Sequence, residues 1–140
     1  MTAKVKNLKQ TVTLTATPLA VYQALLSSKE HAEIIGDTVK TSDKVGGKTI
    51  AYDGWIEATN VLLVPGKKIV QSWRGADWPK GIFSEASFVF KATKTGCTLT
   101  FTQTGIPVEQ FDDIKEGWGE HYWVKMKAYF IKRAKLESKL

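Results

Sequence analysis

Few side chains in this sequence have the types and spacing that catalytic or metal chemistry requires. His31 and His121 are the only histidines, and Cys97 is the only cysteine. His121 directly follows Glu120, but adjacent side chains on a helix point about 100° apart and do not face each other. No His-x-x-His, Cys-x-x-Cys or clustered-carboxylate spacing suits a metal ion. The sequence therefore predicts no metal site, no cofactor and no catalytic residue.

Two catalytic alternatives stay open beside that prediction. Cys97 could form a nucleophilic dyad with either histidine, although it follows a turn glycine and has no base positioned beside it in sequence. Glu57, Asp53 or Tyr122 could do general acid–base work if the fold encloses a cavity. The second alternative would make the protein an enzyme of the cyclase or hydratase kind.

The aromatic residues offer a different chemistry, which is the binding of an apolar molecule. Ligand pockets have mostly apolar walls and a few polar groups that orient the ligand, and Trp and Tyr supply both. Gln71 and Gln103 could add further polar groups to such a pocket, whereas the bland alternative is a filled aromatic core. The predicted ligand-binding residues are Trp73, Arg74, Trp78, Phe88, Phe101, Trp118, Tyr122 and Met126.

Arg74 and Asp77 flank a glycine in the segment W-R-G-A-D-W-P (73–79). One interpretation makes Arg74 the anchor for a ligand carboxylate at the mouth of the cavity. We favour the other, a local Arg–Asp bridge that braces a loop between two tryptophans, because such exposed pairs are commonly part of loop architecture.

Composition and charge exclude several classes of protein. The 140 residues are 43% apolar and 24% charged, as in an ordinary globular domain, and we expect one domain over residues 1–140. The net charge is +6, yet only Arg74 and Arg133 among the 20 basic residues are arginines, and the basic residues are spread along the chain, which argues against nucleic-acid recognition. No apolar run is long enough to span a membrane. The basic N-terminus is not followed by the apolar segment of a secretory signal, and the single cysteine suits a reducing compartment. We therefore expect a cytoplasmic protein.

The last thirty residues predict one long helix with a broad apolar face. At 3.6 residues per turn, one stripe contains Phe111, Ile114, Trp118, Tyr122, Met126, Tyr129 and Leu136, and Trp123, Phe130 and Ala134 widen it. Acidic residues in the early turns and basic residues in the later turns match the helix dipole. Gly117 and Gly119 indicate either a delayed helix start or close backbone packing around Trp118.

The residues before this helix predict short strands and two short helices. Leu8–Ala16 alternates as a strand, Thr17-Pro18 begins a helix, and a second helix runs from Lys29 to Ile35 and ends at Gly36. Turn residues then separate six strand-like runs, at 38–43, 48–53, 55–63, 67–74, 83–92 and 97–104.

These elements predict an α+β fold in which a curved antiparallel sheet of six to seven strands wraps around the C-terminal helix. The alternation in 84–91 points Ser84, Ala86, Phe88 and Phe90 inward, and that in 98–102 points Leu99 and Phe101 inward. The register of 55–63 stays open.

The order of elements and several motifs resemble the family of activators of the heat-shock protein 90 ATPase, within the START-like (SRPBCC) helix-grip superfamily. The motifs are V-Y-Q-A-L-L (21–26), the Gly46-Gly47 turn, D-G-W-I (53–56), L-V-P-G-K-K-I-V-Q-S-W-R (63–74), D-W-P-K-G (77–81), G-I-P (105–107) and E-G-W-G-E-H-Y-W (116–123).

The resemblance implies the helix-grip fold and two kinds of function. Eukaryotic co-chaperones of the family resemble this chain only in their C-terminal domain. Because the first expected strand begins at Leu8, we expect a stand-alone member of the kind found mostly in prokaryotes. Relatives in the wider superfamily hold lipids, sterols, polyketides or plant hormones between sheet and helix.

The leading hypothesis is a non-enzymatic binding protein that holds a small apolar or amphipathic molecule. The alternative is a module that binds a heat-shock protein 90 homologue through its outer surface. Val124, Ala128 and Ile131, on the opposite helix face, are either scattered surface residues or a small contact with a partner or second copy. We expect a monomer or weak dimer that binds no nucleic acid and no membrane.

Overall fold

The computed structural model describes residues 4–139, so Leu140, the expected end of the long helix, lies outside it. The strands are β1 (Val5–Leu14), β2 (Val39–Lys40), β3 (Lys48–Ala51), β4 (Ile56–Val64), β5 (Lys68–Gly75), β6 (Ser84–Thr93) and β7 (Gly96–Pro107). The helices are α1 (Pro18–Leu25), α2 (Ser28–Ile35), the short 3₁₀ turn η1 (Val108–Gln110), α3 (Phe111–Trp118), the π-helix η2 (Gly119–Trp123) and α4 (Val124–Ser138).

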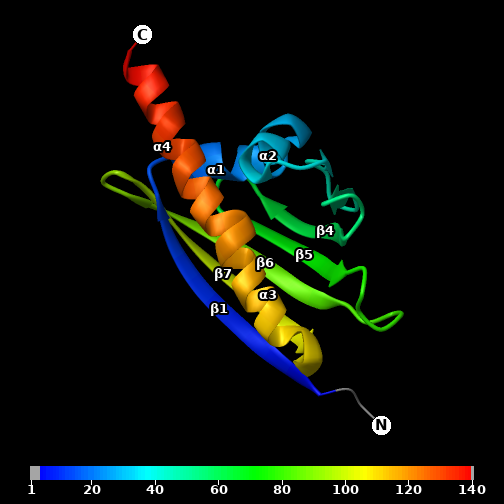
Figure 1. The fold of residues 1–140 in the computed structure, drawn as a ribbon. Coiled ribbons are helices and arrows are strands. Elements are labelled where there is room, and N and C mark those ends of the chain that lie inside the picture. Colours follow the sequence, from blue (N-terminus) through cyan, green and yellow to red (C-terminus); the bar gives the residue numbers. More distant parts are fainter. Residues whose placement is uncertain (1–3, 140) are drawn as a thin grey trace.

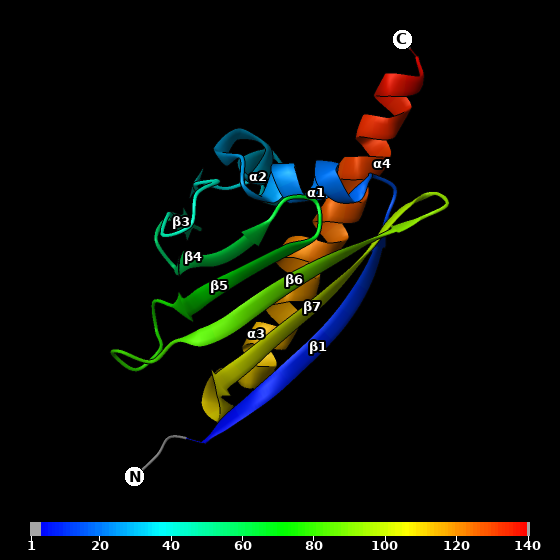
Figure 2. The ribbon, with the colours of Figure 1, turned by 180° about the vertical axis from the view of Figure 1, so that it is seen from behind.

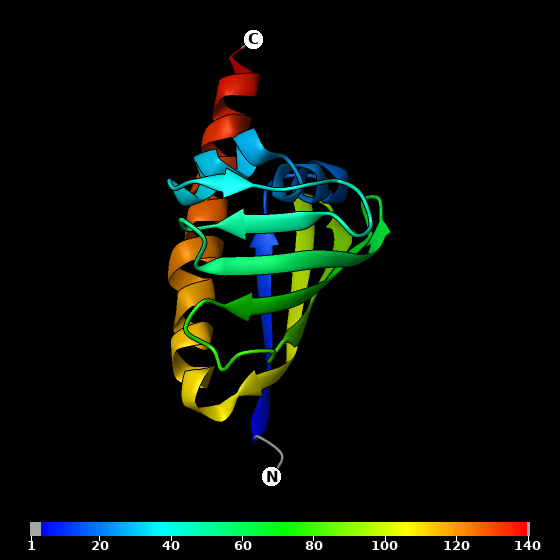
Figure 3. The same ribbon diagram turned by 90° about the vertical axis from the view of Figure 1, so that its right-hand side faces the viewer.

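The strands form one antiparallel sheet in the order β1-β7-β6-β5-β4-β3-β2. The helical segment α3–η2–α4 crosses one face of this sheet, and the sheet curves around it (Figures 1 and 3). Seen from behind, the sheet lies in front and the long helix passes beyond it (Figure 2). This arrangement confirms the predicted α+β helix-grip fold.

Capping residues lie at the expected start of α1 and at the expected end of α2. The Thr17 hydroxyl accepts a hydrogen bond from the Ala20 amide at 3.2 Å, and Pro18 occupies the first turn of α1. Ser27, which is not among the predicted caps, caps α2 in the same way, and α2 begins at Ser28, one residue before the predicted start at Lys29. Gly36 ends α2 in the left-handed conformation, with φ of 69°, as expected of a C-terminal glycine.

The strand faces follow the predicted alternation. Ser84, Ala86, Phe88 and Phe90 are buried, and so are Leu99 and Phe101 on the neighbouring strand. In β4, whose register was open, Ile56, Ala58 and Asn60 are the buried residues. The expected strand over 38–43 is only two residues long, because β2 pairs with β3 at Val39 and Lys40 alone.

The long helix buries the middle of the predicted stripe but not its end. Ile114, Trp118, Tyr122, Met126 and Phe130 are buried against the sheet. Two members of the prediction are wrong, because Leu136 is 57% exposed and Ala134 is also exposed. The physical reason is length: the last turns of α4 extend beyond the edge of the sheet, as Figure 1 shows at the C-terminal end.

Polar contacts attach α2 to α4 beyond the sheet. Arg133 forms an ion pair with Glu30, and the Tyr129 hydroxyl donates to the same carboxylate at 3.2 Å. Lys125 Nζ donates to the Ile35 carbonyl, the last residue of α2, at 2.8 Å. Within residues 4–139, no helix has the length and apolarity needed to cross a bilayer.

A tight approach between two chain segments predicts the effect of one glycine substitution. An added Cβ at Gly96, in the turn between β6 and β7, would lie 2.0 Å from the Leu14 backbone oxygen. Because backbone has to move, Gly96→Ala should lower the free energy of unfolding by about 1–3 kcal/mol. Urea denaturation measures this difference.

The matched control for that substitution is Gly119→Ala, since nothing lies within 4 Å of a Cβ added at Gly119. It should leave stability unchanged or raise it, because alanine favours helix over glycine by about 1 kcal/mol. Equal destabilisation by both substitutions would contradict the packing at Gly96.

Candidate functional site

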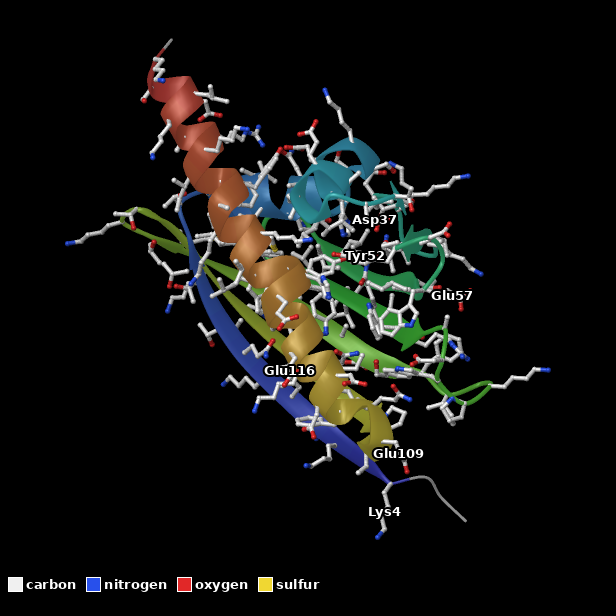
Figure 4. All side chains as sticks on the ribbon, in the orientation of Figure 1. Lys4, Asp37, Tyr52, Glu57, Glu109 and Glu116 are labelled. Atoms are coloured by element: carbon white, nitrogen blue, oxygen red, sulfur yellow. The ribbon has the colours of Figure 1, made fainter. Side chains whose placement is uncertain are left out.

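A pocket with aromatic walls lies between the helical segment α3–η2 and the β3–β4 turn with the strands β4 and β5. Its volume is about 340 Å³. The lining residues come from the β3–β4 turn, from β4 and β5, and from the helix: Tyr52, Trp55, Ile56, Trp73, Asp113, Ile114, Gly117, Trp118, His121 and Tyr122. Figure 4 shows Tyr52 on the side of the sheet that faces the long helix.

The β3–β4 turn brings two aromatic residues, Tyr52 and Trp55, to the pocket, and part of this turn has an unusual backbone conformation. Tyr52 and Asp53 both have positive φ, at 52° and 55°, which costs free energy for residues other than glycine and recurs at functional sites. The Asp53 amide donates to Thr38 Oγ1 at 3.1 Å, which anchors the turn to the chain before β2. The Tyr52 ring then meets the His121 ring edge-on, with centroids 5.4 Å apart.

The π-helix η2 forms the opposite wall. The Val124 amide donates to the Gly119 carbonyl five residues earlier, and single π turns are frequent at functional sites. This wider turn lets Trp118 and Trp123, five residues apart, stack at 5.3 Å with an interplanar angle of 16°.

Both interpretations of Gly117 and Gly119 are wrong. The helix is not delayed, since α3 begins at Phe111. The backbone is not closely packed either: a Cβ on Gly117 would meet only His121 Cδ2, at 3.9 Å, and one on Gly119 would meet nothing within 4 Å. Gly117 instead lines the pocket, and Gly119 begins the π turn.

Tryptophan rings form a continuous group behind the pocket. Trp73 contacts Trp55, Trp78 and Trp118, with ring centroids 6.1, 5.4 and 5.7 Å apart. Trp118 also lies 4.4 Å from the Phe101 ring. Such pairs add about 0.5–1.5 kcal/mol each beyond the burial of their surface, so this wall is rigid.

Buried polar atoms fix the orientation of Trp118. Its Nε1 donates to Gln103 Oε1 at 2.8 Å, and Gln103 Nε2 donates to Ser84 Oγ at 2.8 Å. Ser84 Oγ in turn donates to the Trp73 carbonyl at 2.9 Å. Gln103 is fully buried and is not among the residues that line the pocket; it holds the indole, and its Nε2 and Oε1 each already have a partner.

A histidine–tyrosine pair holds Tyr122. His31 Nδ1 lies 2.9 Å from the Leu25 carbonyl, which can only accept, so Nδ1 carries the hydrogen. In the neutral ring Nε2 is then the acceptor, and the Tyr122 hydroxyl donates to it at 2.8 Å. Burial lowers the pKa of His31 to about 4, partly opposed by the bond to Leu25. Burial also raises the pKa of Tyr122, which keeps the phenol protonated at neutral pH.

The structure brings some predicted ligand-binding residues to the pocket and places others elsewhere. Trp73, Trp118 and Tyr122 lie on the pocket wall, and Phe88 lies beside a small void of about 20 Å³ beneath it. Phe101 and Met126 are fully buried in the core. Trp78 packs behind Trp73, and its Nε1 has no hydrogen-bond partner among the described residues. Contact of any of these residues with a ligand stays a prediction.

Arg74 is engaged by its own loop. Its guanidinium donates to the carbonyls of Trp78, Gly75 and Pro79, at 2.8, 3.4 and 3.5 Å. It is not among the residues that line the pocket. The favoured Arg74–Asp77 bridge is wrong, because within residues 4–139 the ion pairs are Lys44–Asp43, Lys48–Glu57, Arg133–Glu30 and Arg133–Glu137. Backbone carbonyls of a tight loop are nearer partners than the exposed Asp77 carboxylate.

The other residues weighed for chemistry are placed as follows. Cys97 is buried at the start of β7, and burial raises the pKa of its thiol to about 11, which disfavours the nucleophilic thiolate. Glu57 is paired with Lys48 at 4.0 Å, and Asp53 is exposed. Across residues 4–139, no three His, Cys, Asp or Glu side chains gather to hold a metal ion.

Sequence reasoning missed most of the residues that line the pocket away from the tryptophans. Tyr52 lies within the expected strand over 48–53, but β3 ends at Ala51, and the left-handed conformation of Tyr52 places it in the turn at the pocket. On the helix, the acidic early turns are interpreted as matching the helix dipole, which does not single out Asp113, and Gly117 is interpreted as a feature of the helix backbone. The motif D-G-W-I (53–56) was the available signal, because a turn that ends in Trp55 and Ile56 places large side chains at a sheet edge.

Comparisons with protein families and with curated proteins point to the same family. The family described as Activator of Hsp90 ATPase homolog 1-like protein matches residues 15–131. An activator of 90 kDa heat shock protein ATPase homolog from Dictyostelium discoideum is 30% identical over 132 residues, which is 94% of this chain and 34% of that protein. The chain spans between about a quarter and a third of the length of the curated relatives that it matches first.

Solved structures share the fold. An HSP90 activator from Plasmodium falciparum superposes with a TM-score of 0.78 at 22% identity, over 83% of this chain and 89% of that one. The Aha1 dimer from Colwellia psychrerythraea superposes with a TM-score of 0.77 at 18% identity, over 90% of this chain and 97% of that one.

The environment of His31 predicts a pH dependence of stability. An unfolded histidine titrates near pH 6.5, whereas the pKa of His31 in the folded protein is about 4. Between these values the unfolded chain binds a proton that the folded protein does not. The free energy of unfolding should therefore fall as the pH is lowered from about 6.5 to about 4, by up to about 3 kcal/mol.

Two variants isolate this contribution in urea denaturation across that pH range. His31→Gln removes the titrating group but keeps an amide that can donate to Leu25, whereas His121→Gln replaces the exposed histidine. The slope of stability against pH should decrease only in His31→Gln. Parallel slopes in both variants would argue against a buried neutral His31.

Proposed function

This chain belongs to the Activator of Hsp90 ATPase homolog 1-like family, and from that premise we propose that it is a cytoplasmic, non-enzymatic binding protein. In this proposal a small apolar or amphipathic molecule lies in the pocket between the sheet and the helical segment α3–η2. The cytoplasmic location rests on the single, buried cysteine.

The observation that carries the proposal is the pocket itself. Its volume of about 340 Å³ falls within the range of roughly 300–1,000 Å³ that is common for small-molecule sites. Its walls are mostly aromatic and aliphatic side chains, with a few polar groups at Tyr52, Asp113 and His121. An apolar body surrounded by a few orienting groups is the pattern of a ligand site.

The wall is also preorganised. Trp118 is held by Gln103, and Tyr122 is held by His31, so neither side chain has to be ordered when a ligand enters. Side chains that are already fixed lose little conformational freedom on binding. This rigidity favours binding over a role in which the same residues merely fill a core.

Gly117 and Gly119 provide a matched test of the pocket. Gly117 lines it and Gly119 does not, and both sit where a side chain has space. Gly117→Leu should fill the pocket and weaken ligand binding by at least about tenfold, the loss expected when a ligand's apolar burial is blocked. Gly119→Leu should bind as the parent protein does.

The measurement is an NMR titration of backbone amides and tryptophan indoles with fatty acids, sterols and flavonoids. Shifts should gather at Tyr52, Trp55, Trp73 and Trp118 in the parent protein and disappear in Gly117→Leu. Thermal melts of both variants confirm that they fold. A ligand that binds Gly117→Leu and the parent equally would place the site outside this pocket.

A second candidate function follows from the family. The curated relatives are named as activators of the 90 kDa heat shock protein ATPase, and we propose as the alternative that this chain binds a homologue of that chaperone. A surface feature supports it: a groove of about 630 Å³ lies between α2 and α4, and its lining combines three basic side chains and several apolar ones with one acidic side chain. The lining residues are Lys125, Lys132, Arg133, Ile34, Ala128, Tyr129, Leu136 and Glu33. Such a surface suits a partner segment with acidic and apolar residues.

Addition of this protein to a heat-shock protein 90 homologue should then raise the ATP turnover of the chaperone. The increase should be largest at low salt, because exposed charges are screened at high ionic strength. The double substitution Lys132→Glu with Leu136→Glu should abolish the stimulation. Gly117→Leu should retain it, since it alters only the pocket. Unchanged turnover at low salt would count against this function, whatever the pocket binds.

A further inference from the structure

We propose that the pocket selects cationic amphiphiles, molecules with an alkylammonium head and an apolar body, over anionic or neutral ones. This inference rests on the proposed function and specifies its ligand class. It concerns the charge of the pocket, which is opposite to that of the chain as a whole.

The charges at the pocket are the first argument. The chain carries 20 Lys and Arg side chains and a net charge of +6, yet none of those residues is among the ten that line the pocket. The fully charged side chain in the lining is the carboxylate of Asp113, in the first turn of α3. A cation near this carboxylate is therefore attracted by the nearest charge it meets.

The aromatic walls are the second argument. Five rings line the pocket, those of Tyr52, Trp55, Trp73, Trp118 and Tyr122. The face of an aromatic ring carries partial negative charge, and quaternary ammonium ligands are recognised by several such rings around one head group. The same faces repel a carboxylate or phosphate.

Two basic side chains that lie close in sequence to lining residues are engaged elsewhere, which is the third argument: Arg74 follows Trp73, and Lys125 comes three residues after Tyr122. Arg74 donates to the carbonyls of its own loop. Lys125 donates to the Ile35 carbonyl at the end of α2. An anionic ligand would therefore find no guanidinium or ammonium group presented to it by these residues.

A carboxylate from a second element acts on one of the lining residues. The pKa of Tyr52 is raised to about 12, first by burial and second by the carboxylate of Asp37. Figure 4 shows Asp37 and Tyr52 on the same side of the molecule. Asp37, in the chain after α2, is not among the lining residues, but its charge reaches Tyr52 and has the same sign as that of Asp113.

Three probes with the same tail and different heads test the proposal: octyltrimethylammonium, octanoate and octanol. Each is titrated into the full chain near pH 8, where an ordinary histidine is neutral, and the dissociation constant is taken from the indole shifts of the pocket tryptophans. The cation should bind roughly fivefold more tightly than octanol, and octanoate should bind most weakly.

Matched variants assign this preference to the pocket. Asp113→Asn should reduce the preference for the cation over octanol and leave the affinity for octanol unchanged, while the part of the preference that comes from the aromatic rings remains. Asp112→Asn removes the neighbouring exposed carboxylate, which is not in the lining, and should keep the preference. Trp55→Leu, at the partly exposed rim, should lower the affinity for the cation more than the affinity for octanol, because it removes a ring but keeps an apolar side chain.

The outcomes separate this inference from the function on which it rests. Octanol or octanoate binding as tightly as the cation, with the binding lost in Gly117→Leu, would overturn the cation preference and keep the ligand pocket. If none of the three probes at saturation causes an indole shift that Gly117→Leu removes, both the cation preference and the ligand pocket are overturned.

Discussion

The buried indole of Trp118 is the contact on which the rest of the structure depends. It joins the helix to the sheet through the rings of Trp73, Phe88 and Phe101, and its one polar atom must find a partner away from water. Gln103 supplies that partner and is itself held by Ser84, so the hydrogen-bond chain runs from the helix through β7 and β6 to the Trp73 carbonyl of β5. An unpaired buried indole would cost roughly 1–3 kcal/mol, and this chain of bonds avoids that cost while fixing how the helix is rotated against the sheet.

The pocket follows from that rotation. With Trp118 fixed, the π turn brings Trp123 beneath it and keeps Tyr122 against His31, while Gly117 presents bare backbone toward β4. Across the gap, the left-handed residues of the β3–β4 turn direct Tyr52 toward His121. Space remains there because the helix has no side chain at Gly117. The strain at Tyr52 and Asp53 and the π turn lie on opposite sides of the same pocket, which is where deviations from regular geometry are expected in a binding protein.

Charge is distributed unevenly between the outside of the molecule and this pocket. The exposed side of α4 carries Lys127, Lys132 and Lys135, whereas the residues that line the pocket include a carboxylate and aromatic rings but no Lys or Arg. Some basic groups form structural contacts: Arg133 is paired with Glu30, and Lys125 donates to the Ile35 carbonyl. A net charge of +6 therefore describes what the outer surface would attract and says little about the pocket.

The sequence by itself determined the element order, the caps at Thr17 and Gly36, and the inward faces of β6 and β7, because capping and alternation are local physical preferences. It also identified Trp73, Trp118 and Tyr122 as aromatic residues of one interior. Only the tertiary structure decided which of the large apolar and aromatic residues face open space: Phe101 and Met126 are enclosed, whereas Tyr52 and Trp55 line the pocket. That difference depends on how far the helix stands from the curved sheet at each point. The partner of Arg74 was decided in the same way, since three carbonyls of its loop lie closer than the Asp77 carboxylate that is its neighbour in sequence.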